Sequence, residues 1–211
     1  MRKAICYGEV LWDVFPEGKV AGGAPMNVAM RLNALGIPSR VISKIGNDVA
    51  GRELLEIMQN NNLTGTYVKI DANYPTGEAI VNVKADDELA YDIKHPAAWD
   101  KIELSDEMLD LVKKADIFLF GSLALRDDVS RNTLLSLLKV AKYKVFDVNI
   151  RRPYFDIDVV FELMKQSDFI KLNEDELLYV CKALGSEADA LEFNILFLSD
   201  MTETADICIT R

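Results

Sequence analysis

Two adjacent glycines that lead into a helix-like segment are the first feature of this sequence that could take part in chemistry. Gly22 and Gly23 lie in the run AGGAPMNVAMRLNALG, residues 21–36. A glycine pair costs backbone entropy on folding, so its presence indicates a close approach between the chain and another group. At the start of a helix, such a turn presents N–H groups that can bind anions or hydroxyl groups. Taken alone, such a pair usually forms a tight loop that binds nothing.

Other polar side chains with suitable chemistry follow at intervals along the chain. Asp13 and Asn27 supply acceptor and donor groups suited to a polyhydroxylated ligand, although Asp13 could also be a surface acid. Asn173 and Glu176, in the run NEDE, offer oxygen atoms for Mg²⁺ or its water molecules. They could instead form only a helix cap and its capping box. Arg151, in DVNIRR, can balance phosphate charge, or it could close a turn by pairing with an aspartate. Together, these groups are what phosphoryl transfer to a sugar requires.

The elements that must position these groups alternate between short apolar runs and longer segments of helical periodicity. The predicted strands are residues 4–7, 40–45, 117–120, 145–148, 169–172 and 207–210. The predicted helices are residues 25–35, 49–60, 106–115, 129–142, 157–166 and 174–184. Nearly continuous apolar strands indicate a parallel sheet buried on both faces. The expected fold class is therefore α/β, with an open, mostly parallel sheet in three layers.

In such a fold, ligands bind where the carboxyl ends of the strands meet. The polar residues and glycines that follow the predicted strands are Gly8, Glu9 and Asp13; Gly121 and Ser122; Asp147, Asn149 and Arg151; and Asn173, Glu174, Asp175 and Glu176. One edge of the sheet is therefore expected to carry the site.

Two segments break the alternation of strands and helices. Residues 66–93 contain the strand-like runs TYVKI and PTGEAIVNVKADDELAYDI, in which ADDE is typical of a turn. Residues 10–20 are also extended in character. We expect these two segments to form a small β-sheet with one polar face, inserted into the domain near the glycine pair as a lid. The alternative is a hairpin that extends the main sheet.

Composition excludes several classes of partner and indicates one domain, with or without an appendage. The 211 residues carry a formal net charge of −10, which disfavours binding to nucleic acid or to an anionic membrane surface. No apolar run approaches the roughly 18 residues of a membrane-spanning helix. Three scattered cysteines and an N-terminus unlike a signal peptide favour a cytoplasmic protein with reduced thiols. The run ICIT has the character of an interior strand, so we expect the natural protein to continue beyond Arg211.

The glycine-rich run resembles the first signature of the ribokinase-like (PfkB) carbohydrate kinases. That pattern is G-G-x-P-x-N-x-A, six residues, Gly, nine residues, Gly. Its places are filled by Gly22, Gly23, Pro25, Asn27, Ala29, Gly36 and Gly46. DVNIR resembles the family's D-x-N-x-R, and NEDE resembles its N-x-x-E. Within the family, GEVLWDVFPEG and GGAPMNVA are most similar to the bacterial fructokinases.

This resemblance implies an enzyme that uses ATP to phosphorylate a sugar hydroxyl, with fructose converted to fructose 6-phosphate as the first expectation. By the resemblance, Asp13, Gly22, Gly23 and Asn27 would hold the sugar hydroxyls. Arg151 would face the sugar or the transferred phosphoryl group. The lid would close over the sugar and could also form a homodimer contact.

The resemblance also assigns the second substrate and its ion. Asn173 would lie near the ATP phosphates, and Glu176 would hold Mg²⁺ through water. The family's catalytic Asp belongs to a late G-A-G-D motif, which is absent from residues 1–211. We therefore expect the catalytic base and the ATP-base pocket to lie beyond Arg211.

Three other interpretations remain open from the sequence. One is a truncated, non-catalytic sugar-binding protein. A second is a kinase for another sugar, such as ribose or 2-keto-3-deoxygluconate. A dinucleotide-binding oxidoreductase is disfavoured, because the glycines lack G-x-G-x-x-G spacing and do not directly follow the first strand.

Overall fold

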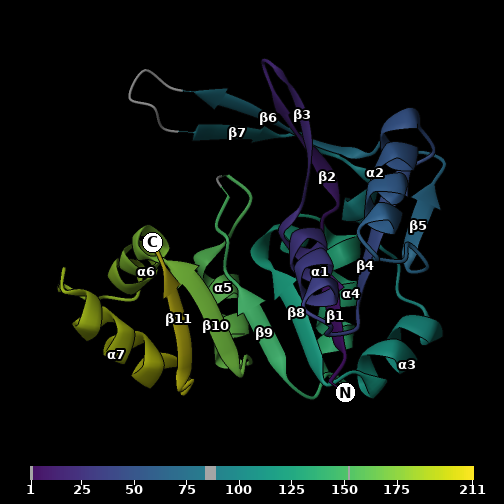
Figure 1. Ribbon diagram of the computed structural model, residues 1–211. Helices are drawn as coiled ribbons and strands as arrows, with labels where there is room; N and C mark the ends of the chain where they lie inside the picture. Colours follow the sequence, from purple (N-terminus) through teal and green to yellow (C-terminus); the bar gives the residue numbers. More distant parts are fainter. Residues whose placement is uncertain (1, 84–88, 152) are drawn as a thin grey trace.

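The computed structural model describes residues 2–83, 89–151 and 153–211, and its main feature is a seven-stranded sheet (Figure 1). The strands of this sheet are β1 (Ala4–Tyr7), β4 (Ser39–Gly46), β5 (Val68–Asp71), β8 (Ile117–Gly121), β9 (Lys144–Asp147), β10 (Phe169–Asn173) and β11 (Asp206–Thr210). Their spatial order is β11-β10-β9-β8-β1-β4-β5, and every neighbouring pair is parallel. The predicted α/β class with a parallel main sheet is confirmed.

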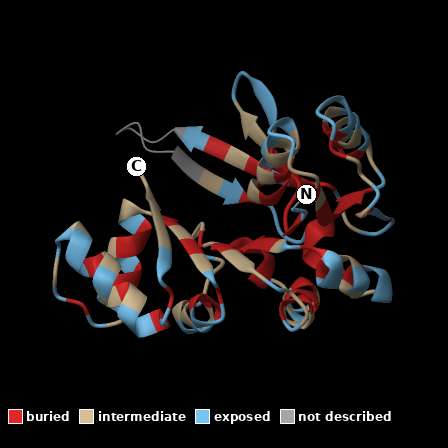
Figure 2. Cartoon of the chain, turned by 60° about the horizontal axis from the view of Figure 1, so that its bottom comes forward, coloured by how far each residue is buried: buried red, intermediate tan, exposed pale blue. Residues whose placement is uncertain are grey.

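Helices cover both faces of this sheet. The α-helices are α1 (Ala24–Ala34), α2 (Val49–Asn60), α3 (Asp106–Lys114), α4 (Asp128–Leu138), α5 (Ile157–Lys165), α6 (Glu174–Ala183) and α7 (Leu191–Thr202). Two short 3-10 helices span Ala98–Lys101 and Ser122–Leu125. Buried side chains of α1 and α2 form one apolar cluster, and those of α3 to α7 belong to another. Figure 2 shows these buried residues concentrated along the strands and the inner sides of the helices.

A second, four-stranded sheet stands over the carboxyl ends of the main-sheet strands (Figure 1). It consists of β2 (Leu11–Phe15), β3 (Gly18–Gly22), β6 (Gly77–Val83) and β7 (Leu89–Ile93), in the order β3-β2-β6-β7. The central pair, β2 and β6, is parallel, whereas the two outer pairs are antiparallel. The predicted small sheet therefore exists, and it begins close to the glycine pair.

The prediction that the small sheet includes residues from position 66 onwards was wrong for the first part of that segment. The run TYVKI contributes β5, which pairs with β4 at the edge of the main sheet, so the small sheet takes only residues 77–93 from the second segment. Val68 is buried in the cluster of α1 and α2, which favours a position at this edge of the main sheet. Alternating apolar and polar residues indicate a strand, but they do not indicate which sheet the strand joins. The predicted ADDE turn lies outside the described residues.

Helix α7 was not predicted from the sequence, because its apolar residues are spread around the helix rather than gathered on one side. Leu198 is buried, whereas Phe193 and Leu196 are exposed. No helix in the described part of the chain is both long and apolar enough to span a membrane.

Candidate functional site

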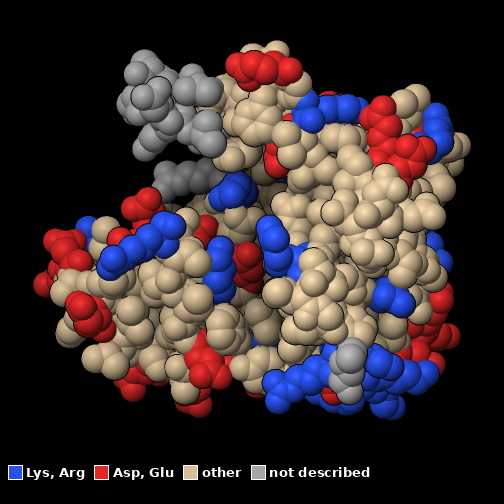
Figure 3. Space-filling model, viewed as in Figure 1, with Lys and Arg blue, Asp and Glu red and all other residues tan. Residues whose placement is uncertain are grey.

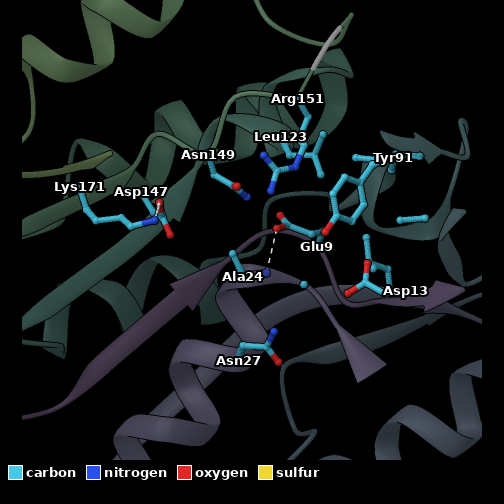
Figure 4. A pocket seen from close by; sticks show the side chains of 14 residues that line it. Glu9, Asp13, Ala24, Asn27, Tyr91, Leu123, Asp147, Asn149, Arg151 and Lys171 are labelled. Carbon is cyan, nitrogen blue, oxygen red and sulfur yellow. Dashed lines mark hydrogen bonds and ion pairs between the residues drawn. The ribbon is translucent and has the colours of Figure 1, made fainter. Parts of the chain in front are cut away.

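A pocket of about 240 Å³ lies between the small sheet and the carboxyl ends of the main-sheet strands. Figure 3 shows basic and acidic side chains gathered in the hollow beneath the small sheet. The pocket is lined by residues from both sheets, from α1, from the short helix Ser122–Leu125 and from loops between these elements. They are Glu9, Leu11, Asp13, Gly23, Ala24, Asn27, Ala79, Tyr91, Ile93, Leu123, Asp147, Asn149, Arg151 and Lys171 (Figure 4). Four predicted site residues, Asp13, Gly23, Asn27 and Arg151, are thus brought together here.

The glycine pair packs directly against the protein's own chain. Gly23 is the N-cap of α1 and has φ 105°, a conformation that side chains rarely adopt. A Cβ at Gly23 would lie 2.4 Å from the backbone oxygen of Glu9, and a Cβ at Gly22 would lie 2.3 Å from Oδ2 of Asp13. Gly22 is beside the pocket and does not line it. Close packing of protein atoms therefore already requires both glycines, before any sugar is considered.

Asp13 projects from β2 and is only half-buried, in a pocket that also contains Arg151. Burial raises the pKa of Asp13 above its ordinary value, and the positive charge of Arg151 offsets part of that rise. Arg151 follows β9, donates from Nη1 to the backbone oxygen of Ile150 at 2.9 Å, and lies 5.2 Å from the ring centroid of Tyr91. A carboxylate and a guanidinium group therefore face the same space.

Glu9 is a pocket residue to which the sequence analysis gave no role beyond its place after the first strand. Its side chain is 2% exposed, and Oε1 accepts a hydrogen bond from the N–H of Ala24 at 3.1 Å. Burial raises the pKa of Glu9 to about 7; backbone N–H groups and Arg151 oppose this rise, and the charge of Asp147 adds to it. A buried glutamate that is half protonated near neutral pH is therefore part of the pocket. No pattern in the sequence marks that burial.

Asp147 pairs with a lysine of the neighbouring strand, since its Oδ1 accepts from Nζ of Lys171 at 3.0 Å. These residues lie opposite each other in the pairing of β9 with β10. The alternative of a turn held by a pair between Asp147 and Arg151 is not observed among the described residues. Lys171 was also missed, although a lysine inside the apolar run FIKL was a usable signal.

Asn173 and Glu176 form a capping box and do not line the pocket. Oδ1 of Asn173 accepts from the N–H of Glu176 at 2.8 Å, and Oε2 of Glu176 accepts from the N–H of Asn173 at 2.9 Å. Oε1 of Glu176 accepts from the N–H of Ile150 at 2.8 Å. The predicted capping box is therefore present, and the glutamate also holds the loop next to Arg151. Among the described residues, no group of three or more His, Cys, Asp or Glu side chains could hold a metal ion unaided.

The small sheet is attached to the body at α2. Nε1 of Trp12 on β2 donates to the backbone oxygen of Ala50 at 3.1 Å, and Lys19 on β3 pairs with Glu53. Ahead of β6, Oγ1 of Thr76 donates to Oδ1 of Asp48, the N-cap of α2, at 2.6 Å. These contacts hold the small sheet in place over the pocket on the side of α2.

Several known proteins are similar to this chain. The family described as pfkB family carbohydrate kinase matches residues 2–195. The chain belongs to this family. "Probable fructokinase-7" of Arabidopsis thaliana is 32% identical over 199 residues, which are 83% of this chain and 58% of that protein. A "putative sugar kinase" of Pyrococcus horikoshii is 35% identical over 181 residues, covering 81% of this chain and 57% of that protein.

Solved structures of relatives share the fold. The fructokinase of Halothermothrix orenii superposes with a TM-score of 0.86 at 19% identity, over 99% of this chain and 79% of that one. The fructokinase of Xylella fastidiosa with bound ATP gives a TM-score of 0.84 at 20% identity, over 99% and 68% of the two chains. This pfkB-family chain spans less than two thirds of the length of the two curated relatives above.

Proposed function

We propose that this chain carries the sugar-binding part of an ATP-dependent sugar kinase, with fructose as the first candidate substrate. The observation that carries the proposal is the convergence of Asp13, Asn27 and Arg151 on one pocket beside the glycine pair. The names of the curated relatives, which include several fructokinases, support the choice of sugar.

The pocket groups divide into those suited to hydroxyls and those suited to phosphate. Asp13 and Asn27 would bind the sugar hydroxyls, and the apolar side chains of Ala79 and Ile93 would exclude water from that end. Arg151 would stabilise negative charge on the phosphoryl group as a sugar hydroxyl attacks it in line. No G-A-G-D motif occurs in residues 1–211, so no residue described above is assigned as the base.

ATP and Mg²⁺ are proposed as cosubstrate and ion. The solved structures of the Xylella fastidiosa fructokinase and the Pyrococcus horikoshii sugar kinase are both described with ATP. We place Asn173 near the phosphates. Both oxygens of Glu176 already accept backbone N–H groups, so this carboxylate would hold Mg²⁺ through water, using its remaining lone pairs. The ion would neutralise charge on the phosphates.

We further propose that the small sheet acts as a lid and forms a homodimer contact, and that the protein works in the cytoplasm. Exposed Val20 on β3 is one apolar side chain that such a contact would cover. Buried Cys6 and Cys181, both free, suit a reducing compartment. Analytical ultracentrifugation at several concentrations tests the dimer, and a Val20→Glu variant that associates like the unchanged protein would contradict the contact.

A second candidate substrate is a sugar acid such as 2-keto-3-deoxygluconate. Arg151 has no carboxylate partner within ion-pair distance among the described residues, so its charge is available to an acidic ligand. A ligand carboxylate in a bidentate pair with this guanidinium would explain its place in the pocket.

Isothermal calorimetry with fructose and with 2-keto-3-deoxygluconate tests both candidates. Replacing Asp13 with Ala removes a charged acceptor, so sugar affinity should fall by about 1.5–3 kcal/mol while the fold is retained. Affinity unchanged in Asp13→Ala would remove Asp13 from the site. Failure of the unchanged protein to bind either ligand would overturn the proposed function.

A further inference from the structure

One oxygen of Glu9 has no hydrogen-bond partner among the residues that the structure describes. Oε1 accepts from the N–H of Ala24, but Oε2 is buried without a hydrogen-bond partner among the described residues. Glu9 lines the pocket and is 2% exposed, so this oxygen is largely removed from bulk solvent (Figure 4). An unpaired buried carboxylate oxygen is unfavourable and is uncommon in folded proteins.

Capping of α1 accounts for only one of the two carboxylate oxygens of Glu9. A carboxylate at a helix N-terminus is stabilised by the free N–H groups and the helix dipole, and the Oε1 contact satisfies that role. A cap does not need a second oxygen directed at a pocket. Capping of α1 therefore leaves Oε2 unaccounted for.

The surroundings of Glu9 also leave Oε2 unpaired. The charged and titratable groups that face it across the pocket are Asp13 on β2, Tyr91 on β7, Asp147 on β9, Arg151 after β9 and Lys171 on β10. Lys171 is paired with Asp147, and Arg151 donates to the backbone oxygen of Ile150. None of them donates to Glu9. The donor that completes this site must come from outside the described chain.

We propose that Glu9 is a second carboxylate contact for the sugar, with Oε2 accepting a hydrogen bond from a ligand hydroxyl while Oε1 stays on the N–H of Ala24. This inference rests on the proposed function of the pocket as a sugar site. A neutral polyol suits the position, because its hydroxyl donates a proton without adding a charge beside Asp13 and Asp147.

The contact has a consequence for the pH dependence of binding. A hydroxyl donates most strongly to the ionised carboxylate, so binding selects ionised Glu9 and releases a proton when Glu9 was protonated beforehand. With the pKa of Glu9 at about 7, the ionised fraction, and with it the affinity, is about tenfold lower at pH 6 than at pH 8. Asp13 is present in every variant of Glu9. A pH dependence of the affinity that is lost when Glu9 is replaced therefore arises from the titration of Glu9.

Calorimetry with fructose at pH 6 and pH 8, on the unchanged protein and on Glu9→Gln, tests the inference. Glutamine keeps the size of the side chain and an acceptor for the N–H of Ala24, but it cannot ionise. We expect it to bind about 10- to 100-fold more weakly than the unchanged protein at pH 8, with the tenfold pH effect lost. Glu78→Gln, an exposed position on β6 outside the pocket, is the matched control and should behave like the unchanged protein.

The outcomes separate this inference from the proposed function. If the unchanged protein binds no fructose, the proposed function fails and the inference fails with it. If the unchanged protein binds and Glu9→Gln has the same affinity and pH profile, only the inference is overturned. Circular dichroism checks that Glu9→Gln is folded. If it is not, Glu9→Asp replaces it, and a shifted carboxylate should weaken binding at least about tenfold while retaining a pH dependence. Unchanged affinity in Glu9→Asp would also overturn the contact.

Discussion

Replacing Glu9 with Gln should change how the stability of the free protein depends on pH. Burial raises the pKa of Glu9 from 4.5 to about 7, so between these values the native state holds a proton that the unfolded chain has released. The free energy of unfolding therefore decreases as pH rises across this range. The stabilising effect of protonated Glu9 is fully present below pH 4.5 and is lost as pH rises through about 7.

The magnitude follows from the two pKa values. A single group that titrates at 4.5 when unfolded and at about 7 when folded lowers the free energy of unfolding by about 2 to 3 kcal/mol between pH 5 and pH 8. Domains of this size are stable by about 5–15 kcal/mol, so the effect is a large part of the total. Glu9→Gln lacks the titration, and its stability should vary less over the same range.

Urea unfolding of the unchanged protein and of Glu9→Gln at pH 5, 6, 7 and 8 measures the effect. The informative quantity is the difference in unfolding free energy between the two proteins as a function of pH, because the buried amide of Gln has its own, pH-independent cost. Glu78→Gln serves as the control, since its side chain is exposed. A difference between the unchanged protein and Glu9→Gln that stays constant from pH 5 to pH 8 would refute the assignment of a raised pKa to Glu9.

Three further substitutions test the supports of the site by denaturant unfolding. Gly23→Ala should destabilise by at least about 2 kcal/mol, because its φ is unfavourable for alanine and its Cβ would lie 2.4 Å from the oxygen of Glu9; a neutral result would mean that this turn relaxes freely. Thr76→Val should cost about 1–3 kcal/mol, because its hydroxyl would no longer donate to Asp48 or accept from the N–H of Gly46, and Thr76→Ser should recover most of that loss of stability. Glu176→Gln should cost about 1–2 kcal/mol, since its amide offers only one acceptor where two N–H groups now bind; equal stability would show that the capping box is dispensable.

Most of the main sheet could be predicted from the sequence, because buried parallel strands are short, continuous apolar runs and the helices between them carry a periodic apolar face. Each predicted main-sheet strand lies within a residue or so of an observed one. The assignment of β5 failed for a different reason. Its partner β4 is more than twenty residues away in the sequence, and local pattern does not encode which edge a short strand joins.

The candidate site was predictable to the extent that its residues follow strands or belong to the glycine-rich run of residues 21–36. Asp13, Asn27 and Arg151 were predicted as ligand-binding residues, and all three line the pocket. The pairing of Lys171 with Asp147 requires the neighbouring order of β9 and β10, which sequence alone does not give. The importance of Glu9 depends on its burial and on the unpaired Oε2, which are properties of the folded chain.

The glycine pair acts on the pocket through two acidic residues. The space that a Cβ of Gly22 would fill is taken by the carboxylate of Asp13, and the space beside Gly23 is taken by the backbone of Glu9. The N–H of Ala24, the next residue, then holds Oε1 of Glu9. Three consecutive residues therefore set the positions of two carboxyl groups in a pocket that Arg151 also lines. Glycine is needed at positions 22 and 23 because the chain there passes close to Asp13 and Glu9. The path of the chain therefore determines where the two carboxyl groups of the pocket lie.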